Sequence, residues 1–387
     1  MFEKSKKVTK LIKNKPKKLF KKSKDFQSTS EDIFSFPLKL LLFTGFEFSM
    51  NSKKKLKSIF FWIGSLICVI QMGFHEIAFL KKPFELRKIS FGTSSTASTF
   101  LYVILLLTFH FNRSEIFKIL ENIKKFFPTK NRSIFKIAKG FKCFVMFSTI
   151  LCISMTFISF LLPFVKFFLF GNRNFLLPLP NLFFDPKSPE IYPVTLILSS
   201  ALPLTGFYYG SVFIIMTMTI ITGIGFQFMI LAQEIRNFRN LSEEEIQEKF
   251  PKWIEKHNEV FENVKKFNEI FSVSFFLRFV TSGTIIAIQL FQLNNADGRN
   301  FSNIFVSAYF IFELIQIFVQ CYFGQFLIDA SESIAKVIYD CGWENWQNIK
   351  LKKLILIVLA KCQKPAKLRI WKFGNISMEQ FTLVSSE

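Results

Sequence analysis

Long apolar stretches separated by charged segments are the dominant pattern along this chain. Most of these stretches contain at least twenty residues with few charges, the length that an α-helix needs to cross a hydrocarbon core about 30 Å thick. The pattern predicts six membrane spans, at Ser58–Leu80, Ile89–Phe111, Phe141–Phe170, Val194–Leu231, Ser272–Leu293 and Ile304–Leu327. The fourth is too long for a single crossing, so we expect it to continue beyond the bilayer as a helix.

Two segments outside the spans also carry helix signals. Ser242 and Glu245 form a capping box, in which each side chain can bond the other residue's amide. Apolar residues recur at helical spacing from Trp253 to Phe276, so we expect the fifth span to continue a helix that begins outside the membrane. A second such helix is predicted from Asp329 to Cys341, with Gly342 as its C-cap.

Lys and Arg are unevenly distributed between the two sides of the predicted spans. Forty of the 50 lie in residues 1–57, 112–140, 232–271 and 328–387, and seven lie in the alternate segments 81–88, 171–193 and 294–303. Basic residues in short loops near spans stay in the cytoplasm, so we expect a cytoplasmic N-terminus. The same distribution explains the net charge of +22 by membrane topology, without a nucleic-acid partner.

The composition agrees with a membrane protein. Half of the 387 residues are hydrophobic, 55 of them are Phe, and the mean hydropathy is +0.32. We therefore expect an all-α, polytopic helical membrane protein in four parts. These are a basic cytoplasmic N-terminus (1–57), a six-helix region with an outer ligand cavity (58–327), a cytoplasmic helical layer (232–271 and 328–365) and the start of a further helix (366–387).

Candidate chemistry is sparse. The three histidines, His75, His110 and His257, have no metal-ligand spacing, and the chain contains no Gly-rich phosphate loop. We expect no enzymatic activity, no catalytic residue, no cofactor and no metal. None of the six cysteines lies in a predicted outside loop, so a disulfide framework is not expected.

A few ionisable groups fall within the predicted spans. Lys166 and Arg278 lie near span ends, where we expect both side chains to extend toward the membrane surface. Glu313 lies about ten residues into the sixth span, where an ionisable group is costly and faces protein or water. A functional role and a simple interhelical hydrogen bond both fit Glu313.

Polar and aromatic residues in the outer halves of the spans suggest a ligand cavity. Such a cavity, with many rings and few polar groups, would suit a small, volatile, apolar ligand. The same spacing would also result if the rings only packed helices together or met lipid. The candidate residues are Thr93, Ser94, Phe157, Phe160, Phe164, Tyr208 and Tyr209.

Several motifs occur in a fixed order in the last third of the chain. They include Gln320-Cys321-Tyr322-Phe323-Gly324, Lys361-Cys362-Gln363-Lys364-Pro365 and Ser377-x-Glu379-x-Phe381. In this order and spacing, His257 to Phe381 resembles the insect odorant receptors. The earlier part agrees in topology, including the cytoplasmic N-terminus.

The resemblance implies a tuning subunit of an odorant-gated, nonselective cation channel in the plasma membrane of sensory neurons. It implies a heteromer with the odorant co-receptor, a pocket framed by helices two, three, four and six, and a cytoplasmic anchor where subunits meet. It also implies a split seventh helix, with the anchor half at Trp343–Gln363, a break at Pro365 and a pore half from Ser377. The anchor positions are Trp343, Trp346, Leu354, Leu356 and Gln363.

The end of the chain departs from the family pattern. Leu354–Ala360 is too short to span, and Ile376–Glu387 gives at most about 18 Å of helix. We therefore expect a tuning subunit whose pore helix is shortened at the C-terminus. A gustatory-type receptor of the same superfamily and a membrane transporter remain as alternatives, although no inverted repeat supports a transporter.

Overall fold

The computed structural model describes residues 86–126, 132–171, 173, 185, 187–294 and 301–386, and isolated positions at 37, 39, 66 and 70. The predicted first span, Ser58–Leu80, and the basic segment 1–57 lie outside these described residues apart from those isolated positions.

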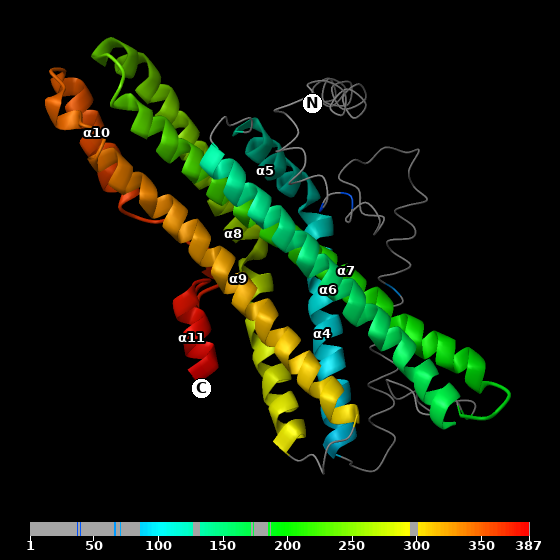
Figure 1. The fold of residues 1–387 in the computed structure, drawn as a ribbon. Coiled ribbons are helices and arrows are strands. Elements are labelled where there is room, and N and C mark those ends of the chain that lie inside the picture. Colours follow the sequence, from blue (N-terminus) through cyan, green and yellow to red (C-terminus); the bar gives the residue numbers. More distant parts are fainter. Residues whose placement is uncertain are drawn as a thin grey trace, which may run out of the picture.

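Five long helices lie alongside one another and form the bundle (Figure 1). They are α4 (Leu86–Phe111), α6 (Arg132–Phe170), α7 (Tyr192–Phe238), α8 (Glu243–Asn294) and α9 (Phe301–Tyr339). Each contains one of the predicted second to sixth spans. The all-α class predicted from the sequence is thereby confirmed, and α7 extends beyond the predicted fourth span as a continuous helix.

Long apolar helices dominate the described part of the chain. Three segments within it are long and apolar enough to cross a membrane: Gly210–Phe238, Glu243–Asn294 and Val306–Asn345. A fourth is the pair Phe100–Phe111 and Arg113–Phe126, if its two helices, bent by 74°, count as one span. The second helix of this pair is α5, which packs against α7 and α8.

Helix α8 confirms that the fifth span continues a helix that begins outside it. The capping box is formed as predicted. The Ser242 amide donates to Glu245 Oε2 at 3.2 Å, and the Glu245 amide donates to Ser242 Oγ at 3.4 Å. The helix then runs for 52 residues, with Pro251 inside it.

The helix predicted at Asp329–Cys341 is present as far as Tyr339, and it continues the sixth span without a break. Helix α9 is continuous to Tyr339. No Gly or Pro interrupts the boundary, and Gln325 Nε2 donates to Asp329 Oδ1 at 2.8 Å across one turn of the helix. A change in polarity alone does not end a helix. Gly342, with φ of +82°, has the left-handed conformation expected of a C-cap.

The split seventh helix is also shorter than predicted at its start. Trp343–Asn345 is a 3₁₀ turn, and α10 runs from Ile349 to Cys362. Asn348 sets this start, because its side chain accepts hydrogen bonds from the amides of Lys350 and Leu351. The anchor half therefore does not begin at Trp343.

A small β-hairpin that the sequence did not predict follows α10. Strand β1 (Arg369–Ile370) pairs antiparallel with β2 (Gly374–Asn375). Helix α11 (Met378–Ser386) follows, at the position where the motif beginning at Ser377 predicted a helix, and it packs along α9 (Figure 1).

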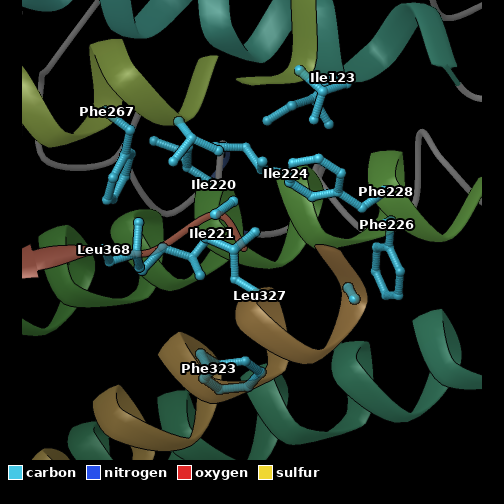
Figure 2. Packing of buried hydrophobic residues seen from close by; sticks show 14 of the residues in the cluster. Ile123, Ile220, Ile221, Ile224, Phe226, Phe228, Phe267, Phe323, Leu327 and Leu368 are labelled. Atoms are coloured by element: carbon cyan, nitrogen blue, oxygen red, sulfur yellow. The ribbon is translucent and has the colours of Figure 1, made fainter. Parts of the chain in front are cut away.

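The hydrophobic core is centred on α7, α8 and α9 and includes residues of α4, α5, α6 and α10. Its side chains interdigitate between these helices, and Leu368 joins them from the segment before β1 (Figure 2). The labelled members of this cluster are Ile123, Ile220, Ile221, Ile224, Phe226, Phe228, Phe267, Phe323, Leu327 and Leu368.

Candidate functional site

A buried ion pair joins α8 to α9 inside the predicted membrane region. Arg278 Nη2 lies 3.2 Å from Glu313 Oε2, and the two side chains are only 5% and 3% exposed. Arg278 also donates to Gln316 Oε1, and Ser282 Oγ donates to Glu313 Oε1 at 3.2 Å. Every charge in this cluster is therefore paired, as buried charges require.

This cluster corrects the expectation for Arg278. Its side chain does not extend to the membrane surface but lies between two helices. The reason is local geometry: Arg278 and Ser282 are one turn apart on α8 and face Glu313 on α9. Because the acceptor was 35 residues away in sequence, no local pattern predicted the pair. Glu313 thus makes an interhelical contact, which is one of the two roles that fitted it in the sequence.

A second cluster lies in the part of α8 before the predicted fifth span, which we expect in the cytoplasm. His257 is 1% exposed, its ring stacks on Trp253 at 5.1 Å, and its Nε2 lies 3.4 Å from Cys362 Sγ on α10. Burial, with the nearby Lys361 ammonium, lowers the pKa of His257 to about 4. Burial raises the pKa of the Cys362 thiol to about 12, so both groups are neutral at physiological pH.

Polar contacts fasten α10 and the hairpin to α8. The Asn348 amide donates to the Glu243 carboxylate at 3.0 Å, and the Gln347 amide donates to the same group. Further along α8, Asn268 donates to the Lys367 carbonyl and accepts from the Arg369 amide, each at 2.9 Å. The layer at this end of the bundle is held by side chains about 100 residues apart in sequence.

The predicted anchor residues occupy different environments. Trp346 is buried, while Trp343 and Leu354 are half-buried against the core. Gln363 is exposed, and Leu356 is 46% exposed. The remaining predicted position, Pro365, follows α10 and is half-buried at the start of the connection to the hairpin. Their role in subunit contact stays a prediction.

Helix α10 presents apolar side chains to its surroundings. Ile349 and Ile357 are 68% and 67% exposed, and with Leu356 they lie on one face of the helix at spacings of seven and eight residues. The opposite face, with Leu351, Ile355, Val358 and Cys362, is buried. The buried side of this helix is therefore covered by the described chain, and its exposed side is largely apolar, with Lys353 between Ile349 and Ile357.

The predicted ligand residues are only partly described. Thr93 and Ser94 lie in α4, and Tyr208 and Tyr209 lie in α7, but their side chains fall outside the described part of the structure. The structure brings the rings of Phe160 and Phe164 together, with centroids 5.2 Å apart. In contrast, Phe157 is 59% exposed on the same helix. The ligand role of all seven residues stays a prediction.

A cleft of about 470 Å³ lies between the end of α7 and the start of α8, at the end of the bundle that we expect in the cytoplasm. Its charged walls include Glu234 and Lys256, whose Oε1 and Nζ atoms are 2.8 Å apart. Such ion-paired walls do not suit an apolar ligand. The residues that the structure describes contain no group of His, Cys, Asp and Glu side chains arranged to hold a metal.

The long apolar helices and the buried ion pair between two of them define a multi-pass helical membrane protein. A family model described as 7tm Odorant receptor matches residues 85–386, so the chain belongs to the 7tm odorant receptor family. The resemblance drawn from the motifs is thereby confirmed. Membership assigns the chain to olfactory receptors rather than to enzymes.

Known relatives agree with this assignment. The chain is 29% identical to an odorant receptor coreceptor of Aedes aegypti over 132 residues, and 30% identical to the putative odorant receptor 85d of Drosophila melanogaster over 123 residues. These matches cover 34% and 32% of this chain, but only 27% and 29% of the relatives' own lengths.

The fold also resembles a solved structure over nearly its whole length. The olfactory receptor OR5 of Machilis hrabei, in complex with eugenol, aligns with a TM-score of 0.78, covering 94% of this chain and 96% of that one. At 12% sequence identity, this likeness establishes the shared fold.

Proposed function

We propose that this chain is an odorant receptor tuning subunit in the plasma membrane of sensory neurons. It binds small, volatile, largely apolar ligands in the outer part of the bundle. Together with the odorant co-receptor, it forms a heteromer that opens a nonselective cation channel. Family membership over residues 85–386 supports the receptor role, and the aromatic residues predicted in the outer halves of the spans support the ligand class.

The observation that carries the heteromer is the exposed apolar face of α10. Helix α10 lies at the end of the bundle that the basic residues place in the cytoplasm (Figure 1). Lipid does not cover an apolar surface there, and single-chain proteins seldom leave a contiguous one open to water. Ile349, Leu356 and Ile357 therefore suit an interface with another subunit.

The test is co-expression with the co-receptor in cells that lack other odorant receptors. We expect odorant-evoked cation current from the pair, with a ligand preference that differs from that of the co-receptor alone. Current of equal size from this chain without the co-receptor would instead favour a gustatory-type receptor. Saturable substrate flux without channel current would favour a transporter.

A pair of matched variants tests the interface directly. Ile357→Asp places a charge in the exposed apolar face, so we expect co-purification of the two subunits to fall at least tenfold. Arg236→Asp places the same charge at an exposed position on α7, outside this face, and should leave co-purification near the wild-type level. Equal assembly of both variants would contradict the role of α10.

A further inference from the structure

One face of α8 carries a line of buried polar side chains through the predicted membrane region. Arg278, Ser282, Gln289 and Gln292 are 4%, 0%, 2% and 6% exposed. Their spacings of four, eleven and fourteen residues are close to whole turns of a 3.6-residue helix. The line runs from the Arg278–Glu313 pair toward the outer end of the bundle.

Gln289 differs from its neighbours along this line. Arg278 and Ser282 both bond Glu313, whereas neither the Nε2 nor the Oε1 atom of Gln289 has a hydrogen-bond partner in the described part of the structure. A buried polar group without a partner loses its hydration and gains nothing in return. Such groups are rare in native proteins and call for a specific explanation.

The depth of Gln289 in the bundle indicates which explanation applies. Helices α4 and α8 run antiparallel and in contact (Figure 1), and Thr108 Oγ1 lies 3.0 Å from Ser274 Oγ between them. Both helices rise about 1.5 Å per residue. On α8, Gln289 lies as many residues after Ser274 as Thr93 lies before Thr108 on the antiparallel α4, so Gln289 and Thr93 are at the same depth. Gln289 thus lies at the depth of the predicted ligand residues Thr93 and Ser94.

A carboxamide offers N–H donors and a carbonyl acceptor side by side. With both vacant, the best match is a ligand group that donates and accepts at once, as the hydroxyl of an alcohol or phenol does. An ether of the same size accepts only, and leaves the Gln289 carbonyl unpaired. We propose that Gln289 is a ligand-binding residue and that it selects hydroxyl-bearing odorants.

This inference rests on the proposed function, because it assigns a chemical class to the ligand of that same receptor. It also adds the fifth span to the pocket that the resemblance frames with helices two, three, four and six. The charged cluster at Arg278 is a separate feature, since its members satisfy one another.

The first test compares ligand pairs of equal heavy-atom count on the heteromer with the co-receptor. Suitable pairs are 1-octanol with heptyl methyl ether, and 1-hexanol with pentyl methyl ether. We expect the wild type to prefer each alcohol by about tenfold in half-maximal concentration, which corresponds to about 1.4 kcal/mol. In Gln289→Met, which keeps length but loses both polar atoms, the ratio should fall to about one.

Gln292→Met is the matched control, because it makes the same substitution at a buried position one turn away. It should retain the preference for alcohols even if expression or current amplitude changes. A preference that survives in Gln289→Met, or a wild type that responds equally to alcohol and ether, would overturn the proposal.

A binding measurement separates this proposal from the proposed function. The same ligand pairs are added to the purified heteromer in detergent, and the shift in thermal unfolding temperature is recorded. A preference for alcohols that disappears in Gln289→Met supports the site even if no ligand evokes current, which would then count against channel function alone. The absence of any preference in the wild type counts against the site.

Discussion

The two ends of the bundle are held together in different ways. At the end expected in the cytoplasm, α8 is tied to α10 and the hairpin through Glu243, Asn268 and the His257–Cys362 contact. Within the predicted membrane region, Arg278 pairs with Glu313 between α8 and α9, and further outward Gln289 has no hydrogen-bond partner among the described residues. The difference fits the proposed roles, in which one end takes part in subunit assembly and the other binds the ligand.

The largest expected effect comes from breaking the membrane pair. Arg278→Met leaves the Glu313 carboxylate buried without its partner, so we expect a loss of about 3–5 kcal/mol in stability. The thermal unfolding temperature of the purified heteromer measures this loss. The double variant Arg278→Met/Glu313→Leu should recover much of it, since neither charge remains.

Arg236→Met is the control, because Arg236 is exposed at the end of α7. It should leave the unfolding temperature nearly unchanged. Equal behaviour of the single and double variants at the membrane pair would contradict a role for the unpaired charge.

The cluster of His257 and Cys362 should make stability depend on pH. The folded-state pKa of His257, about 4, is below its usual value of about 6.5. As the pH falls, this residue therefore binds a proton in the unfolded chain before it does so in the folded chain. The stabilising contribution is thus complete above pH 6.5 and is lost as pH falls toward 4, to a limit of about 3 kcal/mol.

Unfolding temperatures measured between pH 7 and pH 4.5 check this prediction. His257→Gln removes the titrating ring and should flatten the slope in this range relative to the wild type. An unchanged slope in the variant would assign the pH dependence to other groups.

Stability should be sensitive to a methyl group added at Gly324, where α9 closely approaches the connection before α11. A Cβ at Gly324 would lie 2.4 Å from the Ile376 carbonyl oxygen, so the backbone of that connection must move. We expect Gly324→Ala to cost about 1–3 kcal/mol, seen as a lower unfolding temperature and faster proteolysis after residue 363. Gly283→Ala, with open space around its Cβ, should be neutral or slightly stabilising.

The smallest effect is expected at the start of α8. Ser242→Ala removes one half of the capping box, with an expected cost of about 1 kcal/mol. Ser242→Asp keeps an acceptor at the N-cap and should retain most of the wild-type stability. Hydrogen exchange in the first turn of α8 measures the local effect, and identical exchange in the two variants would contradict it.

Much of the fold followed from local sequence patterns. Apolar runs located the second to sixth spans, and the Ser242–Glu245 spacing located the start of α8, because helix formation and capping depend on residues within a few positions of one another. Ordered motifs between His257 and Phe381 also identified the family. The candidate ligand residues were chosen on the same basis, and the structure describes the side chains of three of them, Phe157, Phe160 and Phe164.

Only the tertiary structure decided which polar groups meet. Arg278 could have reached the membrane surface, and it lies inside because Glu313 on another helix offers it a partner. His257 meets Cys362 across 105 residues, and Gln289 meets no hydrogen-bond partner among the described residues. Helix positions depend on neighbours in sequence, whereas the partners of buried polar groups depend on how distant helices pack, and the sequence pattern does not record that packing.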